Sequence, residues 1–266
     1  MNHTLTFDNE KFFDDVSNTN GWKRNAKKRS ERLSKREKKE EVKRQEARLP
    51  SVRHVSPMTE TQRKTFEAFE SGQNMILHGV AGTGKTFISL YLALEATLSG
   101  RAPKPIVIIR SVVPTRDMGF LPGNTKEKSA IYEAPYSAIC KELIIDHPNA
   151  YEHLKGRGYI EFATTSFIRG LTFRNNTIIV DECQNLTFHE LDSVITRMGE
   201  GSRVIFCGDF RQSDLWREDE RNGLKKFMSI VTKMKSFSRI EFNKDDIVRS
   251  EVVKEYILAK LEEGFV

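Results

Sequence analysis

The sequence of 266 residues has few cysteines and no long apolar run. Cys140, Cys183 and Cys207 lie far apart and form no CxxC pair, which argues against a disulfide framework or a cysteine zinc site and favours buried thiols. No stretch approaches the roughly eighteen consecutive apolar residues that a membrane span needs, and the N-terminus lacks the basic flank and apolar run of a signal peptide. We therefore expect a cytoplasmic protein without a membrane segment.

Positive charge is in excess, but it is confined to one segment. The net charge is +6, and residues 23–48 contain thirteen Lys or Arg against five Glu, a local +8 that leaves −2 elsewhere. This segment has too few apolar residues to bury a helical face. It is either an electrostatic arm for nucleic-acid phosphates or a solvated helix or linker that maintains solubility. We assign residues 1–57 to a charged N-terminal extension and residues 58–266 to a folded domain.

Within the predicted domain, short β-rich runs alternate with longer amphipathic stretches. Near-continuous apolar runs such as "TIIVD" indicate strands buried on both faces, and hence an α/β fold with a mainly parallel sheet between helices. The five predicted strands are residues 74–78, 106–110, 159–164, 177–181 and 203–207, to which 237–242 could add a last strand. The predicted helices are residues 62–71, 85–98, 129–147, 188–198, 223–235 and 250–261, the last with Ser250 as its N-cap.

The glycines before the first long helix identify a phosphate-binding loop. Residues 79–86 read G-V-A-G-T-G-K-T and match G-x-x-x-x-G-K-[ST] at every specified position, between a predicted strand and a predicted helix. Backbone amides at the helix N-terminus would face an anion, Lys85 would reach the β- and γ-phosphates of ATP, and the Thr86 hydroxyl would ligate Mg²⁺. The alternative is a turn that is merely rich in glycine. The residues expected to surround the nucleotide are Gly79, Val80, Ala81, Gly82, Thr83, Gly84, Lys85 and Thr86.

Two acids follow a buried strand, at the place where a phosphate-binding loop needs a partner for Mg²⁺. Asp181 ends the predicted strand at 177–181 and would hold the ion together with Thr86. Glu182 comes next and would orient and deprotonate the attacking water, which indicates a hydrolase. The alternative is that both acids only cap the following helix.

Two glutamines are further candidates for contacts with the nucleotide. Gln212 follows the next predicted strand in the run "GDFRQ", and its amide could contact the γ-phosphate or the attacking water; the alternative is a plain turn. Gln62 lies on the helix before the first strand, and its amide could pair with adenine N6 and N7. The alternative for Gln62 is an exposed glutamine on a helix surface.

Taken in order, these motifs resemble the first motor domain of superfamily 1 helicases. The set consists of Gln62, residues 79–86, Asp181, Glu182, Gln184, Gly208, Asp209 and Gln212. A closer resemblance is to the PhoH-like ATPases of bacteria and bacteriophages, through "GFLPGNTKEK" (119–128), "IRGLTFRNNTIIVDECQNLT" (168–187) and "DDIVRS" (245–250). It covers residues 58–266 and implies a RecA-like P-loop NTPase core that hydrolyses ATP with Mg²⁺.

The resemblance also implies partners and one further site residue. A PhoH-like motor core is expected to act with single-stranded RNA or DNA and to form a homo-oligomer, for which a hexameric ring is one form. Arg249 resembles the arginine that contacts the γ-phosphate in superfamily 1, either in cis or across a subunit boundary; the alternative is a salt bridge to Asp245 or Asp246. By the same resemblance, Arg110 and the loop 120–123 correspond to the helicase segment that touches nucleic acid, where Phe120 could stack on a base; the alternative for Phe120 is an aromatic that only fills space in the packing.

Two other functions stay open beside an ATPase coupled to a polynucleotide. One is an assembly or regulatory protein in which ATP controls oligomer contacts and no polynucleotide is moved. The other is a small-molecule kinase, which is disfavoured because Glu182 would activate water and because such a kinase is expected to carry a lid of basic residues after the acidic motif.

Overall fold

The computed structural model describes residues 49–99, 104–111, 125–165, 168, 170–209 and 218–264. It divides the chain into Met1–Leu49 and a compact unit, Pro50–Val266. The predicted basic arm at 23–48 lies outside the described residues. Within the described part of the chain, no helix is long and apolar enough to cross a membrane.

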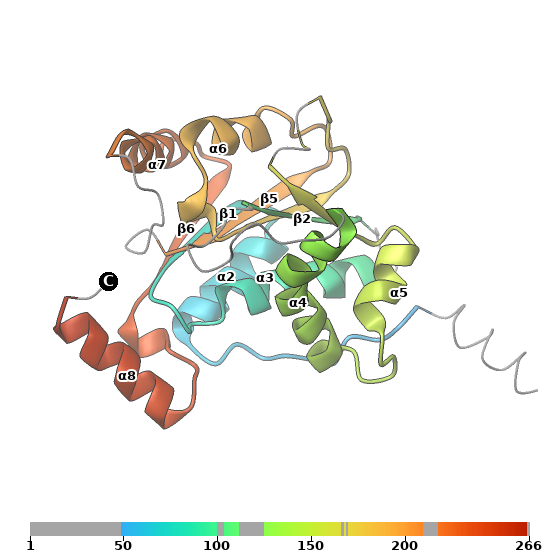
Figure 1. Cartoon of the computed structure of the whole chain (residues 1–266), viewed down its shortest axis with the longest axis horizontal. Coiled ribbons are helices and arrows are strands. Elements are labelled where there is room, and N and C mark those ends of the chain that lie inside the picture. Colours follow the sequence, from blue (N-terminus) through green and yellow to red (C-terminus); the bar gives the residue numbers. More distant parts are fainter. Residues whose placement is uncertain are drawn as a thin grey trace, which may run out of the picture. The chain divides into compact units, whose positions relative to one another are not determined.

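The compact unit is built on one parallel sheet with the strand order β3-β2-β4-β5-β1-β6 (Figure 1). All neighbouring strands run parallel, which confirms the predicted α/β class. The sheet has six strands rather than five, because Phe237–Phe242, the segment that could add a last strand, forms β6 beside β1. The strands are β1 (Asn74–Gly79), β2 (Ile106–Arg110), β3 (Ile160–Thr164), β4 (Thr177–Asp181), β5 (Arg203–Gly208) and β6 (Phe237–Phe242).

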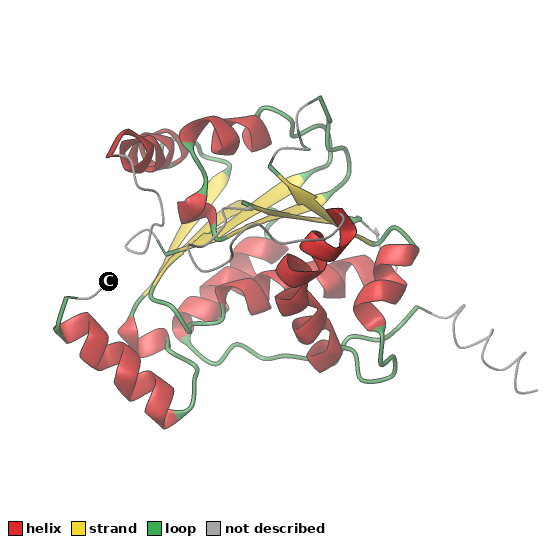
Figure 2. Ribbon diagram, in the orientation of Figure 1, coloured by secondary structure: helices red, strands yellow, loops and turns green. Residues whose placement is uncertain are grey.

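Helices cover both faces of the sheet (Figures 1 and 2). Helices α6 and α7 pack on one face, and α2, α3, α4 and α5 pack on the other. The helices are α2 (Glu60–Glu70), α3 (Lys85–Leu98), α4 (Thr125–Leu143), α5 (Ala150–Gly156), α6 (Phe188–Ile195), α7 (Glu218–Val231) and α8 (Glu251–Glu262), with 3-10 turns at Cys183–Asn185 and Lys244–Asp246. The helix predicted at 129–147 ends at Leu143, and α5 follows as a separate short helix. Ser250 is the N-cap residue of α8, although its side chain makes no capping hydrogen bond.

Successive side chains of the central strands point to opposite faces of the sheet, and this divides the hydrophobic core into two clusters. Met75 and Leu77 of β1 face the cluster under α3 and α4, whereas Ile76 faces the cluster under α6 and α7. Successive side chains of a strand point to opposite faces, so a strand buried on both sides must be apolar throughout. Strand β4 shows this directly, since all five of its residues are buried.

The packed unit begins upstream of the boundary expected at Met58. The backbone amide of Arg53 donates to the Leu143 carbonyl at 2.8 Å, and the Arg53 side chain pairs with Glu142 at 2.7 Å. The Val55 amide donates to the Tyr91 hydroxyl at 3.3 Å. Residues 50–57 therefore lie along α3 and α4 as part of the compact unit.

The register of the sheet brings chemically active residues to one edge. Arg110 and Asp181 are paired in register at the carboxyl ends of β2 and β4, and His78 pairs with Gly208 at those of β1 and β5. Parallel strands end on the same side, so residues that follow them converge even when they are far apart in sequence. This carboxyl edge of the sheet is where the predicted nucleotide site should lie.

We expect Gly79→Ala to destabilise the fold strongly, because β6 leaves no room for a side chain there. Gly79 has a φ of +120°, and a Cβ atom on it would lie 1.9 Å from the carbonyl oxygen of Phe242. The expected loss of unfolding free energy is more than about 3 kcal/mol, measured by urea unfolding followed by circular dichroism. The control is Gly72→Ala, where φ is +76° and no atom lies within 4 Å; its expected cost is about 1 kcal/mol. Equal losses in the two variants would show that β6 yields to the new methyl group.

Candidate nucleotide-binding site

A cleft of about 680 Å³ opens at the carboxyl edge of the sheet. Its floor is the phosphate-binding loop, and its walls include the cleft-facing side of α4 and the segment before α2. A volume in this range suits a ligand of the size of a nucleotide. Residues that line the cleft include Val55, Met58, Gln62, Lys85, Thr86, Arg110, Pro135, Ile139, Asp181, Glu182, Gln184, Asp209, Val248 and Arg249.

The loop between β1 and α3 has the backbone that its glycines allow. Gly82 and Gly84 have φ values of +77° and +83°, and α3 begins directly afterwards at Lys85. The first amides of α3 have no partner within the helix and carry the positive end of its dipole. The backbone of residues 79–86 thus favours an anion at this place, and the loop opens onto the cleft.

Lys85 is held at the base of the loop by the loop's own carbonyl groups. Its Nζ atom donates to the carbonyl oxygens of Gly79 at 2.9 Å and Val80 at 2.8 Å. Burial lowers the pKa of the Lys85 ammonium below its ordinary value, and the negative charge of Asp209 opposes this shift. The Lys85 Nζ atom therefore lies at the base of the loop, beside the place that favours an anion.

Thr86 and Asp181 meet at the cleft although 95 residues separate them. The Thr86 hydroxyl donates to Asp181 Oδ1 at 2.7 Å, and the Tyr136 hydroxyl donates to Oδ2 at 2.8 Å. Asp181 is buried, and burial raises the pKa of its carboxyl group; the charge of Glu182 adds to this, whereas the hydrogen bonds from Thr86 and Tyr136 oppose it. A hydroxyl and a carboxylate are ligands that Mg²⁺ prefers, and substrate phosphates commonly complete such sites.

Glu182 is held in an unusual backbone conformation next to Asp181. Its φ is +51°, which is rare outside glycine and clusters at functional sites. Gln184 Nε2 donates to Glu182 Oε2 at 2.6 Å, and Gln184 Oε1 accepts the Asp209 amide at 3.1 Å. The acids do not cap α6: that role belongs to Thr187, which forms a capping box with a glutamate three residues on.

Gln62 is buried against the phosphate-binding loop rather than exposed on α2. Its Oε1 atom accepts the Met58 amide at 2.7 Å, and its Nε2 atom donates to the Thr83 carbonyl at 3.3 Å. The side chain therefore ties the segment before α2 to the loop. Both ends of the amide already have a partner within the chain, so a contact with adenine would be additional to these bonds.

Arg249 lies beside the loop of its own chain. The Val248 amide donates to the Gly82 carbonyl at 3.1 Å, and a Cβ atom added to Gly82 would lie 3.1 Å from Arg249 Cγ. The Arg249 side chain is exposed and lines the cleft. Two other predicted residues, Gln212 and Phe120, lie outside the described residues.

The structure also brings three residues to the site for which sequence analysis predicts no role. Tyr136 reaches Asp181 from α4, and nothing in its local pattern separates it from an ordinary core tyrosine. Gln184 belongs to the acidic motif, but its bridge to Asp209 needs the neighbouring strand β5. His78 accepts a hydrogen bond from Arg239 Nε at 2.8 Å, and burial, with the Arg239 charge, lowers its pKa to about 4.

Comparison with known proteins agrees with the motifs. The PhoH-like protein family model matches residues 54–260. A PhoH-like protein of Synechocystis is 34% identical over 210 residues, which cover 77% of this chain and 62% of that protein. A PhoH-like protein of Bacillus subtilis is 35% identical over 199 residues, with 74% and 61% covered. The chain thus spans about three fifths of the length of these two relatives.

Among solved structures, Bacteroides Pif1 bound to ssDNA gives a partial match. The TM-score is 0.40 with 15% identity, over 77% of this chain and 46% of that one. The family match, in contrast, includes every residue named above as lining the cleft, from Val55 to Arg249. Because the family model matches residues 54–260, the chain belongs to the PhoH-like protein family, and its parallel α/β domain is a P-loop core.

Proposed function

We propose that this chain is a magnesium-dependent ATPase whose hydrolysis is coupled to single-stranded RNA or DNA. The observation that carries the proposal is the contact between Thr86 and Asp181, 2.7 Å apart at the phosphate-binding loop, with Glu182 next in the chain. Few structural roles require a hydroxyl, a carboxylate and a second acid together at a helix N-terminus. In phosphoryl transfer to water each has a use, because a hydroxyl and a carboxylate can hold Mg²⁺ and a second acid can accept a proton from the attacking water.

Each of these side chains has a definite task in the proposed reaction. Mg²⁺ would be held by Thr86 and Asp181, and it would neutralise charge on the phosphates of ATP. Lys85 would exchange its contacts with loop carbonyls for phosphate oxygens. Glu182 would take a proton from the attacking water, held in place by Gln184. Arg249 would neutralise charge that develops on the transferred group.

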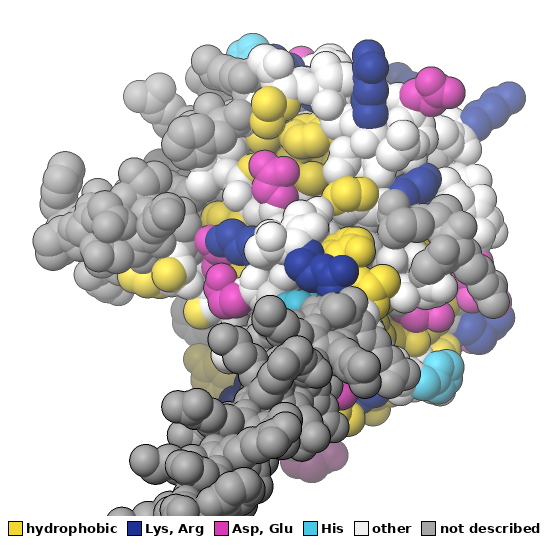
Figure 3. Space-filling model, turned by 90° about the vertical axis from the view of Figure 1, so that its right-hand side faces the viewer, with side chains coloured by type: hydrophobic (Ala, Val, Ile, Leu, Met, Phe, Trp, Pro, Cys, Tyr) yellow, Lys and Arg dark blue, Asp and Glu magenta, His cyan; other side chains and the backbone are white. Residues whose placement is uncertain are grey.

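The proposed coupling to a polynucleotide rests on the family and on the basic segment at 23–48. Figure 3 shows one face of the described domain, on which Lys and Arg side chains are interspersed with Asp and Glu side chains. Support for a phosphate-backbone partner therefore does not come from that face. We also propose a homo-oligomer in the cytoplasm, with a hexameric ring as one possible form; the alternative function is ATP-controlled assembly without movement of a polynucleotide.

The test is steady-state phosphate release from ATP and Mg²⁺ by the full chain, with and without single-stranded RNA or DNA. We expect turnover that requires Mg²⁺ and rises several-fold with the polynucleotide. Turnover that is indifferent to both polynucleotides, accompanied by an ATP-dependent change in molecular mass by light scattering, would support the assembly function instead. Absence of phosphate release under all these conditions would contradict an ATPase.

A further inference from the structure

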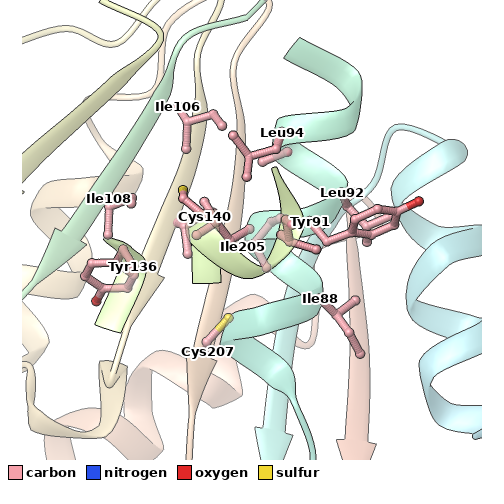
Figure 4. Close-up of a cluster of buried hydrophobic side chains, with 14 of the residues drawn as sticks. Ile88, Tyr91, Leu92, Leu94, Ile106, Ile108, Tyr136, Cys140, Ile205 and Cys207 are labelled. Carbon is pink, nitrogen blue, oxygen red and sulfur yellow. The ribbon is translucent and has the colours of Figure 1, made fainter. Parts of the chain in front are cut away.

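Tyr136 is a buried side chain of α4 that ends on the acid of the proposed metal site. Its relative exposure is 0%, and its hydroxyl donates to Asp181 Oδ2 at 2.8 Å. The ring packs in the hydrophobic cluster beside Ile108, with Cys140 on the same helix (Figure 4). A phenylalanine ring would fill the same space in the core. The hydroxyl therefore needs a separate explanation, because burying a polar group costs free energy unless it is hydrogen-bonded.

The direction of this hydrogen bond follows from the two groups that form it. An ionised carboxylate has no proton to donate, so the phenol donates its proton to Asp181 Oδ2. Arg110 pairs with Asp181 in the sheet register, which places its positive charge at the same edge of the sheet. A phenol is an ordinary hydrogen-bond donor at physiological pH, so this contact needs no further group to maintain it.

The two oxygens of Asp181 have different partners, and this separates their roles. Thr86 occupies Oδ1, and these two groups are the proposed ligands of Mg²⁺. A metal held by them would take the place of their mutual hydrogen bond. The bond from Tyr136 to Oδ2 does not compete with it. Tyr136 can thus hold the carboxylate whether or not the Thr86 contact is present.

We propose that Tyr136 is a positioning residue that orients the Asp181 carboxylate for metal binding, from a helix that also forms one wall of the nucleotide cleft. The inference rests on the proposed function of the site. Helix α4 contributes Pro135 and Ile139 to the cleft, so the same helix contacts the nucleotide space and the acid. Partners of this kind, which hold a metal ligand without touching the metal, typically contribute 10- to 100-fold to metal affinity.

The variant that tests the inference is Tyr136→Phe, which removes one oxygen and keeps the buried ring. The probe is Mn²⁺ with ADP, with free Mn²⁺ followed by electron paramagnetic resonance. We expect the dissociation constant for Mn²⁺ in the presence of ADP to rise by about 10- to 100-fold. Affinity for ADP in EDTA, measured by calorimetry, should stay within about twofold of wild type, because the phosphate-binding loop is unchanged.

Tyr151→Phe is a matched control on the neighbouring helix α5. Tyr151 is also buried, and its hydroxyl donates at 2.7 Å to a carboxylate of α4, that of Glu133, which does not line the cleft. This variant should retain wild-type affinity for Mn²⁺ with ADP. Unchanged Mn²⁺ affinity in Tyr136→Phe would overturn the inference, as would loss of ADP binding in EDTA, which would show a structural role. If the wild-type chain itself holds no Mn²⁺ with ADP, the proposed function fails rather than the role of Tyr136.

Discussion

Glu182→Gln should lower the rate of phosphate release by about 10² to 10⁴ while leaving ATP binding nearly unchanged. Glutamine has the size of glutamate but cannot accept a proton from the attacking water. The measurement is a single-turnover assay of phosphate release, paired with an equilibrium titration of a non-hydrolysable ATP analogue. A loss confined to the chemical step identifies a residue that acts in the transition state.

The geometry around Glu182 allows this substitution to change the charge while the hydrogen bond and the backbone conformation stay the same. The Glu182 side chain accepts from Gln184 Nε2 at 2.6 Å, and the oxygen of a glutamine amide can accept the same bond. The backbone at φ +51° is shared by the two residue types, so any strain is common to both. The change therefore removes charge and basicity without removing the contact that positions the side chain.

Removing a carboxylate elsewhere is the matched control for Glu182→Gln. Glu161 on β3 is exposed and does not line the cleft. Glu161→Gln makes the same change in net charge and should keep wild-type turnover. A Glu182→Gln variant that retained more than about a tenth of wild-type turnover would contradict the role of general base.

The fold could be predicted well where the burial of an element produces a clear hydrophobic pattern in its own residues. Strand β4 is apolar throughout because both of its faces are covered, and its predicted bounds match the structure. Strand β6 lies at the edge and alternates buried with exposed residues, so its signal is weaker and the sixth strand was left open. Helix α5 has seven residues, too few for a clear helical period, and it was missed.

The same distinction applies to the site: features that follow from a local sequence motif could be predicted, and features that depend on tertiary contacts could not. The loop at 79–86 is a local pattern, and the contact of Thr86 with Asp181 follows because parallel strands end at one edge. The bond from Tyr136 could not be predicted, because a tyrosine on an amphipathic helix has the same periodicity whatever its hydroxyl meets. Gln62 shows the converse: its position was noticed, but its ties to backbone groups of Met58 and Thr83 depend on the fold of two separate segments.

Arg249→Ala should reduce ATP turnover by about 10³ to 10⁵ if the arginine neutralises charge on the transferred phosphoryl group. ATP binding should change little, because Lys85 and the loop amides remain. The measurement is the same single-turnover assay, with Lys244→Ala as control. Lys244 lies in the 3-10 turn Lys244–Asp246 just upstream, is exposed and does not line the cleft. Unchanged turnover in Arg249→Ala would leave the arginine with no part in the reaction.

The position of Arg249 also predicts which subunit it serves. It stands against Gly82 of its own chain, anchored by the bond from the Val248 amide to the Gly82 carbonyl at 3.1 Å. If it acts in cis, mixing Arg249→Ala chains with Lys85→Ala chains cannot restore activity, because every site lacks one of the two residues. An arginine that acted across a subunit boundary would instead give active mixed sites, each with Lys85 from one chain and Arg249 from the other. We expect no recovery of turnover on mixing, and recovery would show that the catalytic arginine comes from a neighbouring subunit.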